Sequence, residues 1–172
     1  MTAKMTARTL AFAVLTAASV ALSGCGFTPL YAQTGVISSL GSIDVVAPEG
    51  RTGFLIRQSL DDALARNRGG PAAYRMNLAL SEARYPRGIR IDNVATRYEY
   101  VLTASYVLAT MPSGAVAKRG TVRVELTYDS ADQPYASIAA QQDAQERGAE
   151  EAARRIQLEL AAWLATGAKP KA

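Results

Sequence analysis

The chain has 172 residues, with 19 basic and 15 acidic side chains, one cysteine and no histidine. A single thiol cannot form an internal disulfide, and without histidine the chain lacks the commonest general base and a principal metal ligand. The sequence also carries no GxSxG, HExxH or Gly-rich phosphate-binding motif. We therefore expect no enzyme and no bound metal or cofactor, and only a mechanism that uses carboxylates alone stays open.

The cysteine, Cys25, directly follows the longest apolar run of the chain. Lys4 and Arg8 precede an uncharged run over residues 10–22, which is too short to cross a bilayer but typical of a signal peptide. The run ends in LSGC, which resembles the bacterial lipobox, whose cysteine receives a diacylglyceryl group and then an acyl chain such as palmitate. We predict a lipoprotein signal peptide over residues 1–24 and lipid attachment at Cys25. A plain secretory signal, or a core cysteine beside a buried helix, is the alternative.

Residue 26 is Gly, whereas many lipoproteins retained in the inner membrane carry Asp there, so the resemblance implies an outer-membrane anchor facing the periplasm. Two or three acyl chains hold a protein firmly in a membrane. Removal of the signal leaves 148 residues with 17 basic and 15 acidic side chains, a balance that argues against nucleic acid as a partner. We expect one domain over residues 25–166 and a disordered tail over residues 167–172.

The first elements predicted along the chain are a strand and a helix. SIDVVAP, residues 42–48, places Ile43, Val45 and Ala47 on one face of a half-buried strand that ends at proline. The following segment carries the apolar stripe of an amphipathic helix, and Gly69, Gly70 and Pro71 end it. The residues of the stripe are Ile56, Leu60, Ala63 and Leu64.

Three alternating segments come next, and each predicts a strand with one covered face. The clearest is ATRYEYVLTASYVLAT, residues 95–110. The apolar positions are Met76, Leu78 and Leu80 in the first segment; Tyr98, Tyr100, Leu102, Ala104, Tyr106 and Leu108 in the second; and Val122, Val124, Leu126 and Tyr128 in the third.

The last predicted element is one long helix from about Pro134 to Thr166, with proline acceptable in its first turn. Its apolar stripe is rich in alanine, which lets the helix lie close to a sheet. The stripe consists of Ala149, Ala152, Ala153, Ile156, Leu160 and Trp163. We predict an α+β fold, a four-stranded mixed sheet with two helices on one face in the order β-α-β-β-β-α. The first two strands are joined through a helix and are expected to be parallel.

The second face of this sheet carries polar residues interspersed with Val101, Val107 and Ala109. A strand of some fourteen residues is about 45 Å long, and long bare edges invite pairing with other chains. The sequence leaves two possibilities: the strands are bent or broken, or another structure surrounds the sheet.

The residues directly after the lipobox, CGFTPLY (25–31), together with the order of the elements, resemble the LptE family of lipopolysaccharide-assembly lipoproteins, in its alphaproteobacterial form. The resemblance implies a plug inside the outer-membrane β-barrel LptD, which helps the barrel assemble and delivers lipopolysaccharide to the outer leaflet. An auxiliary envelope lipoprotein that binds another complex or a small ligand is the alternative.

The family also implies basic residues that contact lipopolysaccharide, in the loop between strands two and three and just after strand four. The first region, ARYPRGIRIDN, carries Arg84, Arg87 and Arg90, which we take as candidate contacts. The second region, residues 129–143, has no Lys or Arg, so that half of the pattern is missing. If strands one and two are parallel, the arginine loop lies at the opposite pole from Lys118 and Arg119. A solvated loop tip without a ligand is the alternative.

Overall fold

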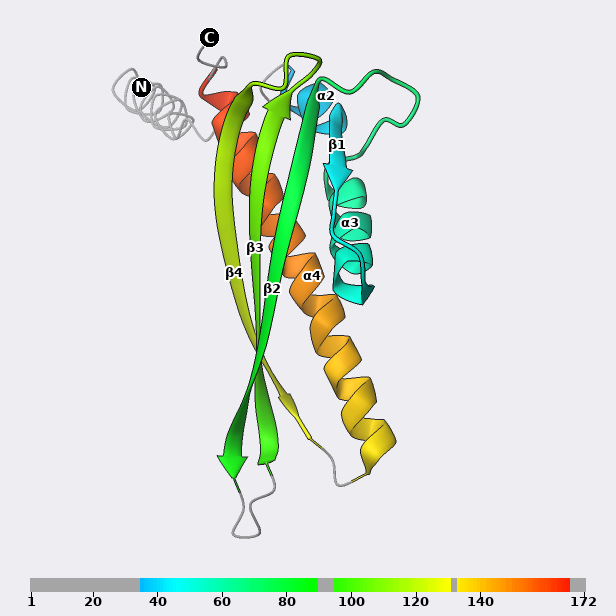
Figure 1. The fold of residues 1–172 in the computed structure, drawn as a ribbon, viewed down its shortest axis with the longest axis vertical. Helices are drawn as coiled ribbons and strands as arrows, with labels where there is room; N and C mark the ends of the chain where they lie inside the picture. Colours follow the sequence, from blue (N-terminus) through cyan, green and yellow to red (C-terminus); the bar gives the residue numbers. More distant parts are fainter. Residues whose placement is uncertain (1–34, 90–94, 131–132, 168–172) are drawn as a thin grey trace, which may run out of the picture.

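The computed structural model describes residues 35–89, 95–130 and 133–167. Seven elements follow one another along this part of the chain (Figure 1). They are α2 (Val36–Gly41), β1 (Ile43–Val46), α3 (Arg51–Ala63), β2 (Tyr74–Ile89), β3 (Ala95–Thr110), β4 (Val116–Asp129) and α4 (Pro134–Ala165). The predicted α+β class and the order of the strands and two larger helices are confirmed, and α2 is an additional short helix that was not predicted.

The four strands form one sheet in the order β1-β2-β3-β4. β1 and β2 are parallel, with Ile43 opposite Tyr74, and α3 makes the crossover between them, as predicted. The β2–β3 and β3–β4 pairs are antiparallel. The sheet is therefore mixed, and only its first pair is parallel.

Both larger helices lie on the same side of the sheet (Figure 1). α4 contacts α3, β4 and β3, whereas α3 also contacts β1. The core between the sheet and the helices contains the predicted alternating positions, and it excludes almost all solvent: Ile56, Leu60, Met76, Leu102 and Leu108 are each 0% exposed. On α4, the alanines predicted to allow close approach are buried as well, at Ala149, Ala152 and Ala153.

No described element covers the other face of the sheet, here called the open face. Odd-numbered residues of β3, and those of β4 from Arg119 onward, point to this face, because the even-numbered residues between them face the helices. Val101 is nevertheless only 3% exposed, since side chains of the adjoining strands surround it. The open face thus combines a narrow apolar centre with charged side chains around it.

The long strands are continuous and strongly twisted, so that they cross in projection toward one end (Figure 1). β2 and β3 each have 16 residues, and the β3–β4 ladder contains one register shift, between Leu108 and Ala109. Twist relieves the strain of a long flat sheet, so the strands need not break.

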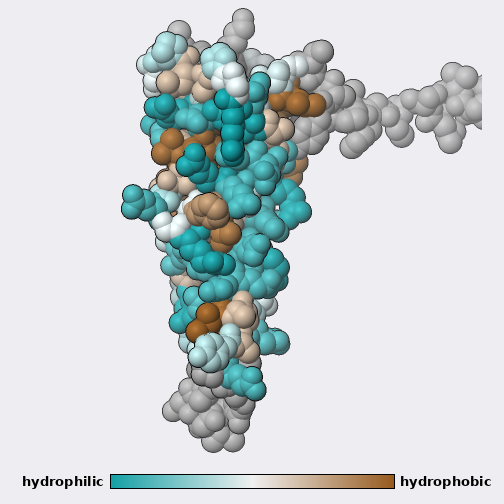
Figure 2. Space-filling view, turned by 90° about the vertical axis from the view of Figure 1, so that its right-hand side faces the viewer, coloured by the Kyte–Doolittle hydropathy of each residue, from teal (hydrophilic) through white to brown (hydrophobic). Residues whose placement is uncertain are grey.

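No helix among the described residues is both long enough and apolar enough to cross a membrane. Figure 2 shows the side of the molecule that carries β1 and α3, which is mainly hydrophilic with scattered apolar residues. Phe54 of α3 is the most exposed apolar side chain in these two elements, at 67%.

Candidate functional site: the distal arginine pair

The predicted arginine loop is largely strand. β2 continues to Ile89 and β3 begins at Ala95, so Arg84 and Arg87 lie within β2 and not in the connecting loop as expected. The strand extends further than predicted because ladder pairing with β3 overrides the weak local β preference of YPRG. Arg90 lies outside the described residues.

Strand alternation separates two of the candidate arginines. Arg84 is opposite Tyr100 and faces the helices, where its Nη1 donates a 2.7 Å hydrogen bond to Gln141 Oε1 on α4. Its guanidinium also lies 4.9 Å from the centre of the Tyr98 ring, which is a cation–π distance. Arg84 is thus on the opposite face of the sheet from Arg87.

Arg87 lies on the open face, directly opposite Arg97 of β3. Two like charges opposite each other repel across a ladder, and here each has an acidic neighbour. Arg87 Nε donates to Glu99 Oε2 at 2.9 Å, and Arg97 Nε donates to Asp129 Oδ1 at 2.8 Å. The side chains of Arg87 and Arg97 remain 59% and 57% exposed, so both guanidinium groups are accessible from solvent.

A shallow hollow of about 600 Å³ accompanies this pair of residues, which we call the distal arginine pair. Its lining includes Gly88 and Thr96, whose hydroxyl donates a 2.7 Å hydrogen bond to the Gly88 carbonyl. Gly88 has φ +60°, a left-handed conformation that glycine adopts without cost. This hydrogen bond therefore fixes the backbone at Gly88, next to Arg87 and Arg97.

The second basic group of the sequence lies at the other pole of the sheet, as predicted. Lys118 and Arg119 pair with Leu108 and Val107 near the β3–β4 turn. Val107 is ten residues from Arg97 along β3, which corresponds to about 33 Å of strand. The two basic groups cannot form one patch.

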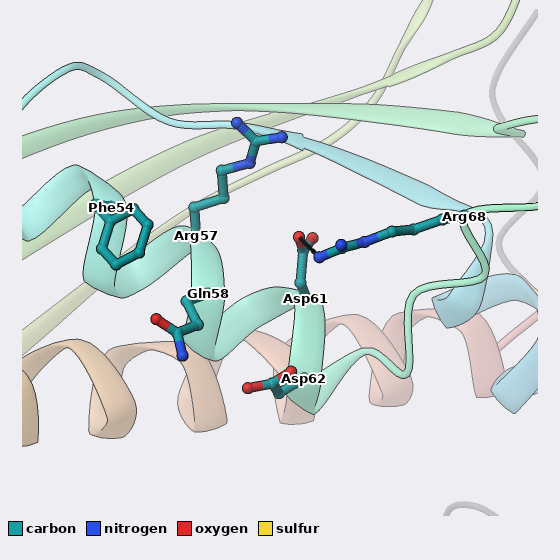
Figure 3. Close-up of a pocket in the computed structure, with 6 residues that line it drawn as sticks. All are labelled: Phe54, Arg57, Gln58, Asp61, Asp62 and Arg68. Atoms are coloured by element: carbon teal, nitrogen blue, oxygen red, sulfur yellow. Dashed lines mark hydrogen bonds and ion pairs between the residues drawn. The ribbon is translucent and has the colours of Figure 1, made fainter.

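A different hollow, of about 620 Å³, lies against the outer side of α3 (Figure 3). Its charged residues are partly paired with one another, because Arg68 Nη2 is 3.2 Å from Asp61 Oδ2. Among the described residues no cluster of side chains could hold a metal ion. The basic and acidic side chains that line this hollow are mixed, so its charge does not favour a ligand of either sign.

Arg97 was not among the candidate site residues predicted from the sequence, which were Arg84, Arg87 and Arg90. The sequence did contain a sign of Arg97's position. In a hairpin, residues at equal distances from the connection lie opposite each other. Arg87 and Arg97 satisfy that relation. The relation holds only because β2 continues to Ile89, and the apolar alternation of Met76, Leu78 and Leu80 does not reach that far.

The chain was compared with protein families, curated sequences and solved structures. The family model for LptE, lipopolysaccharide-assembly, matches residues 40–160. A search of curated protein sequences finds no match.

Similar folds occur among solved structures. A crystal structure at 2.40 Å of a candidate lipoprotein from Caulobacter crescentus CB15 has 55% sequence identity and a TM-score of 0.68, over 80% of this chain and 100% of that one. The rare lipoprotein B from Shewanella oneidensis has 15% identity and a TM-score of 0.56, over 72% and 95% of the two chains. Lipoprotein B from Nitrosomonas europaea has 14% identity and a TM-score of 0.55, over 73% and 84%. The last two likenesses concern the fold alone.

The family model spans more than two thirds of the chain, including every strand and nearly all of the helix layer. The family is one of assembly proteins and not of enzymes, in keeping with the expectation drawn from composition. The chain belongs to the LptE family of lipopolysaccharide-assembly proteins.

Proposed function

We propose that the protein is a lipid-anchored outer-membrane lipoprotein on the periplasmic side, acting as plug and assembly factor of an LptD-type β-barrel. That barrel would place lipopolysaccharide in the outer leaflet. Membership of the LptE family supports the part in lipopolysaccharide assembly. The LSGC motif supports anchoring through acyl chains on Cys25, which lies outside the described residues.

The molecule is elongated, and its two poles differ. The described chain begins at Gly35, near the pole that carries α2 and the β3–β4 turn (Figure 1). Cys25 precedes Gly35 by ten residues, so a lipid on Cys25 is tethered to that pole. The distal arginine pair lies at the opposite pole, away from the anchor.

The observation that carries the ligand part of the proposal is the opposition of Arg87 and Arg97 on the open face. Guanidinium groups bind phosphate through paired N–H donors, and lipopolysaccharide carries phosphates on its lipid and core. A bound phosphate would offset the repulsion between the two arginines and would compete with Glu99 and Asp129 for them. Arg90 would add a third charge from the connection, whereas Arg84 lies on the opposite face of the sheet, bonded to Gln141.

Co-purification tests the barrel partner most directly. The native protein, extracted from membranes and captured without cross-linking, should bring with it a larger outer-membrane β-barrel, the partner that the family resemblance implies. Depletion of the protein should leave this barrel misfolded or degraded, because the plug would support its closure. If barrel abundance and heat-resistant migration stay normal after depletion, the protein is an auxiliary envelope lipoprotein and not a plug.

A further inference from the structure

β4 is an edge strand of unusual length. It has 14 residues, and in the sheet order it pairs with β3 on one side only. In Figure 1 it forms the outer margin of the sheet, and no described strand lies beyond it. Long unpaired edges accept strands from other chains, and natural proteins usually keep them short or cover them.

The hydrogen bonds identify which backbone groups face outward. Ser130 N donates to Thr96 O, so even-numbered residues of β4 exchange hydrogen bonds with β3. The odd-numbered residues therefore direct their N–H and C=O groups to the outer edge. A hydrogen bond from α4 supports this assignment: Arg155 Nη1 donates at 2.9 Å to the carbonyl of Arg123, which points to the outer edge.

The side chains of these odd-numbered residues have an ordered pattern of charge. All six lie exposed on the open face, with basic and acidic residues segregated on the two sides of Val124. In chain order they are Arg119, Thr121, Arg123, Glu125, Thr127 and Asp129. When the strand is reversed about Val124, each arginine position coincides with an acidic residue, and the two threonine positions coincide with each other.

We propose that the β4 edge pairs with the β4 edge of a second copy of this chain, antiparallel, about a two-fold axis at Val124. In this register Arg123 is opposite Glu125 of the second copy, and Arg119 is opposite Asp129 of the second copy. Within one chain Arg123 Nε lies 2.7 Å from Glu125 Oε1, and Asp129 accepts a hydrogen bond from Arg97, so pairing of the two edges shares these exposed charges between the copies. Thr121 is opposite Thr127 of the second copy. The pair forms an eight-stranded sheet, with the helices of both copies on the same side.

Neighbouring registers are less favourable for a definite reason. Outward groups can pair only with outward groups, so odd-numbered residues must meet odd-numbered residues. An axis at Arg123 places the two copies of Arg123 opposite each other, and an axis at Glu125 does the same for Glu125. Like charges opposite each other are destabilising. Axes at Val122 or Leu126 keep only one of the two kinds of Arg–acid pair. Arg155 does not prevent pairing, since a carbonyl oxygen can accept two hydrogen bonds.

This inference goes beyond the proposed function, because it concerns the chain alone and does not depend on a barrel or on lipopolysaccharide. The second copy is preferred over a foreign strand because the charge pattern is self-complementary. Cross-strand charge pairs act mainly on register and partner choice, so a register-specific experiment is the appropriate test.

Disulfide trapping tests the register. The full chain in detergent carries Cys25→Ala, which removes its one cysteine, together with either Thr121→Cys or Thr127→Cys. An equal mixture of the two variants should form a disulfide-linked dimer under mild oxidation, because opposed Cα atoms lie about 5.5 Å apart. Each variant alone should not, since its two cysteines would be about 20 Å apart along the paired strands. Equal cross-linking of one variant alone would overturn the proposed register.

Sedimentation equilibrium tests the charge pairing. The unsubstituted protein should be dimeric at about 100 µM, well above a micromolar dissociation constant. Arg123→Glu should weaken the dimer roughly tenfold, because two attractive pairs become repulsive. The swap Arg123→Glu with Glu125→Arg should restore it. Arg57→Glu on α3 is the matched control and should change nothing. A protein that stays monomeric at this concentration, or a dimer indifferent to Arg123→Glu, would rule the proposal out.

Discussion

The Tyr106 hydroxyl on β3 donates a 2.7 Å hydrogen bond to Glu159 Oε2 on α4, which connects the sheet to the helix layer across the core. Tyr100 of β3 also donates to a carboxylate, Glu82 at 2.8 Å, but this one lies on the neighbouring strand β2. Each ring packs against a glycine: a Cβ on Gly120 would lie 2.5 Å from the Tyr106 ring, and a Cβ on Gly148 would lie 2.9 Å from Tyr100. Each tyrosine therefore has a carboxylate that accepts from its hydroxyl group and a glycine that leaves room for its ring.

Replacement of Gly120 by alanine should destabilise the domain by about 1–3 kcal/mol, because the new methyl group overlaps the ring of Tyr106, which is only 1% exposed. Urea unfolding followed by circular dichroism measures the change. Gly69→Ala is the control, since the nearest atom to its Cβ is Asn67 Oδ1, at an ordinary 3.5 Å. Equal stability of Gly120→Ala and the unsubstituted protein would mean that Tyr106 can move away.

Alkaline pH should weaken the fold through the same tyrosines. Burial, then the hydrogen bond and charge of Glu82 or Glu159, raise the pKa of Tyr100 and Tyr106. The folded state holds these protons more tightly than the unfolded state, whose tyrosines titrate near pH 10. The stabilisation is complete below about pH 10 and is lost as the pH rises further, by roughly 1 kcal/mol for each of the two tyrosines at about pH 11.

Urea midpoints at about pH 8 and about pH 11 measure this loss. The double variant Tyr100→Phe with Tyr106→Phe has no such protons, so its midpoint should fall less over the same interval. An identical fall in both proteins would assign the alkaline loss to other groups.

The distal arginine pair should contribute to binding of lipopolysaccharide. Arg87→Ala with Arg97→Ala should weaken binding at least tenfold, since each charge-assisted contact contributes about 1.5–3 kcal/mol where water is excluded. Fluorescent lipopolysaccharide titrated into the purified protein gives the dissociation constant. Arg87→Ala with Arg90→Ala should have a similar effect, whereas Arg84→Ala should have a smaller one, because Arg84 is already bonded to Gln141.

The control for this series is Lys118→Ala with Arg119→Ala, at the other pole of the sheet. It removes the same formal charge and should change binding much less. Equal weakening by both double variants would indicate non-specific attraction, and unchanged binding by the arginine variants would exclude the distal pair.

Cys25→Ala should abolish incorporation of radioactive palmitate and leave an unprocessed precursor, because the thiol is the atom that accepts the lipid. Labelling of whole cells followed by gel electrophoresis measures both effects. Ser23→Ala, a small residue at the position before Gly24, should keep labelling intact. Continued palmitate labelling and normal processing of Cys25→Ala would contradict the lipobox interpretation.

The sequence by itself determined the strands, their inward faces and the two main helices, because these follow from local period. Alternation of Tyr100, Leu102 and Ala104 assigns a covered face without knowledge of what covers it. The helical connection of β1 to β2 likewise required a parallel pair.

Only the tertiary structure decided how far β2 runs, which face each arginine takes and which residues meet across the fold. Arg84 and Arg87 are three residues apart, so strand pleating places them on opposite faces, whereas a loop would have left them together. The partner of Tyr106 lies 53 residues further along the chain, and no local pattern identifies it. Such contacts depend on the packing of α4 over β4 and β3, and that geometry arises only when distant segments bury their apolar faces against each other.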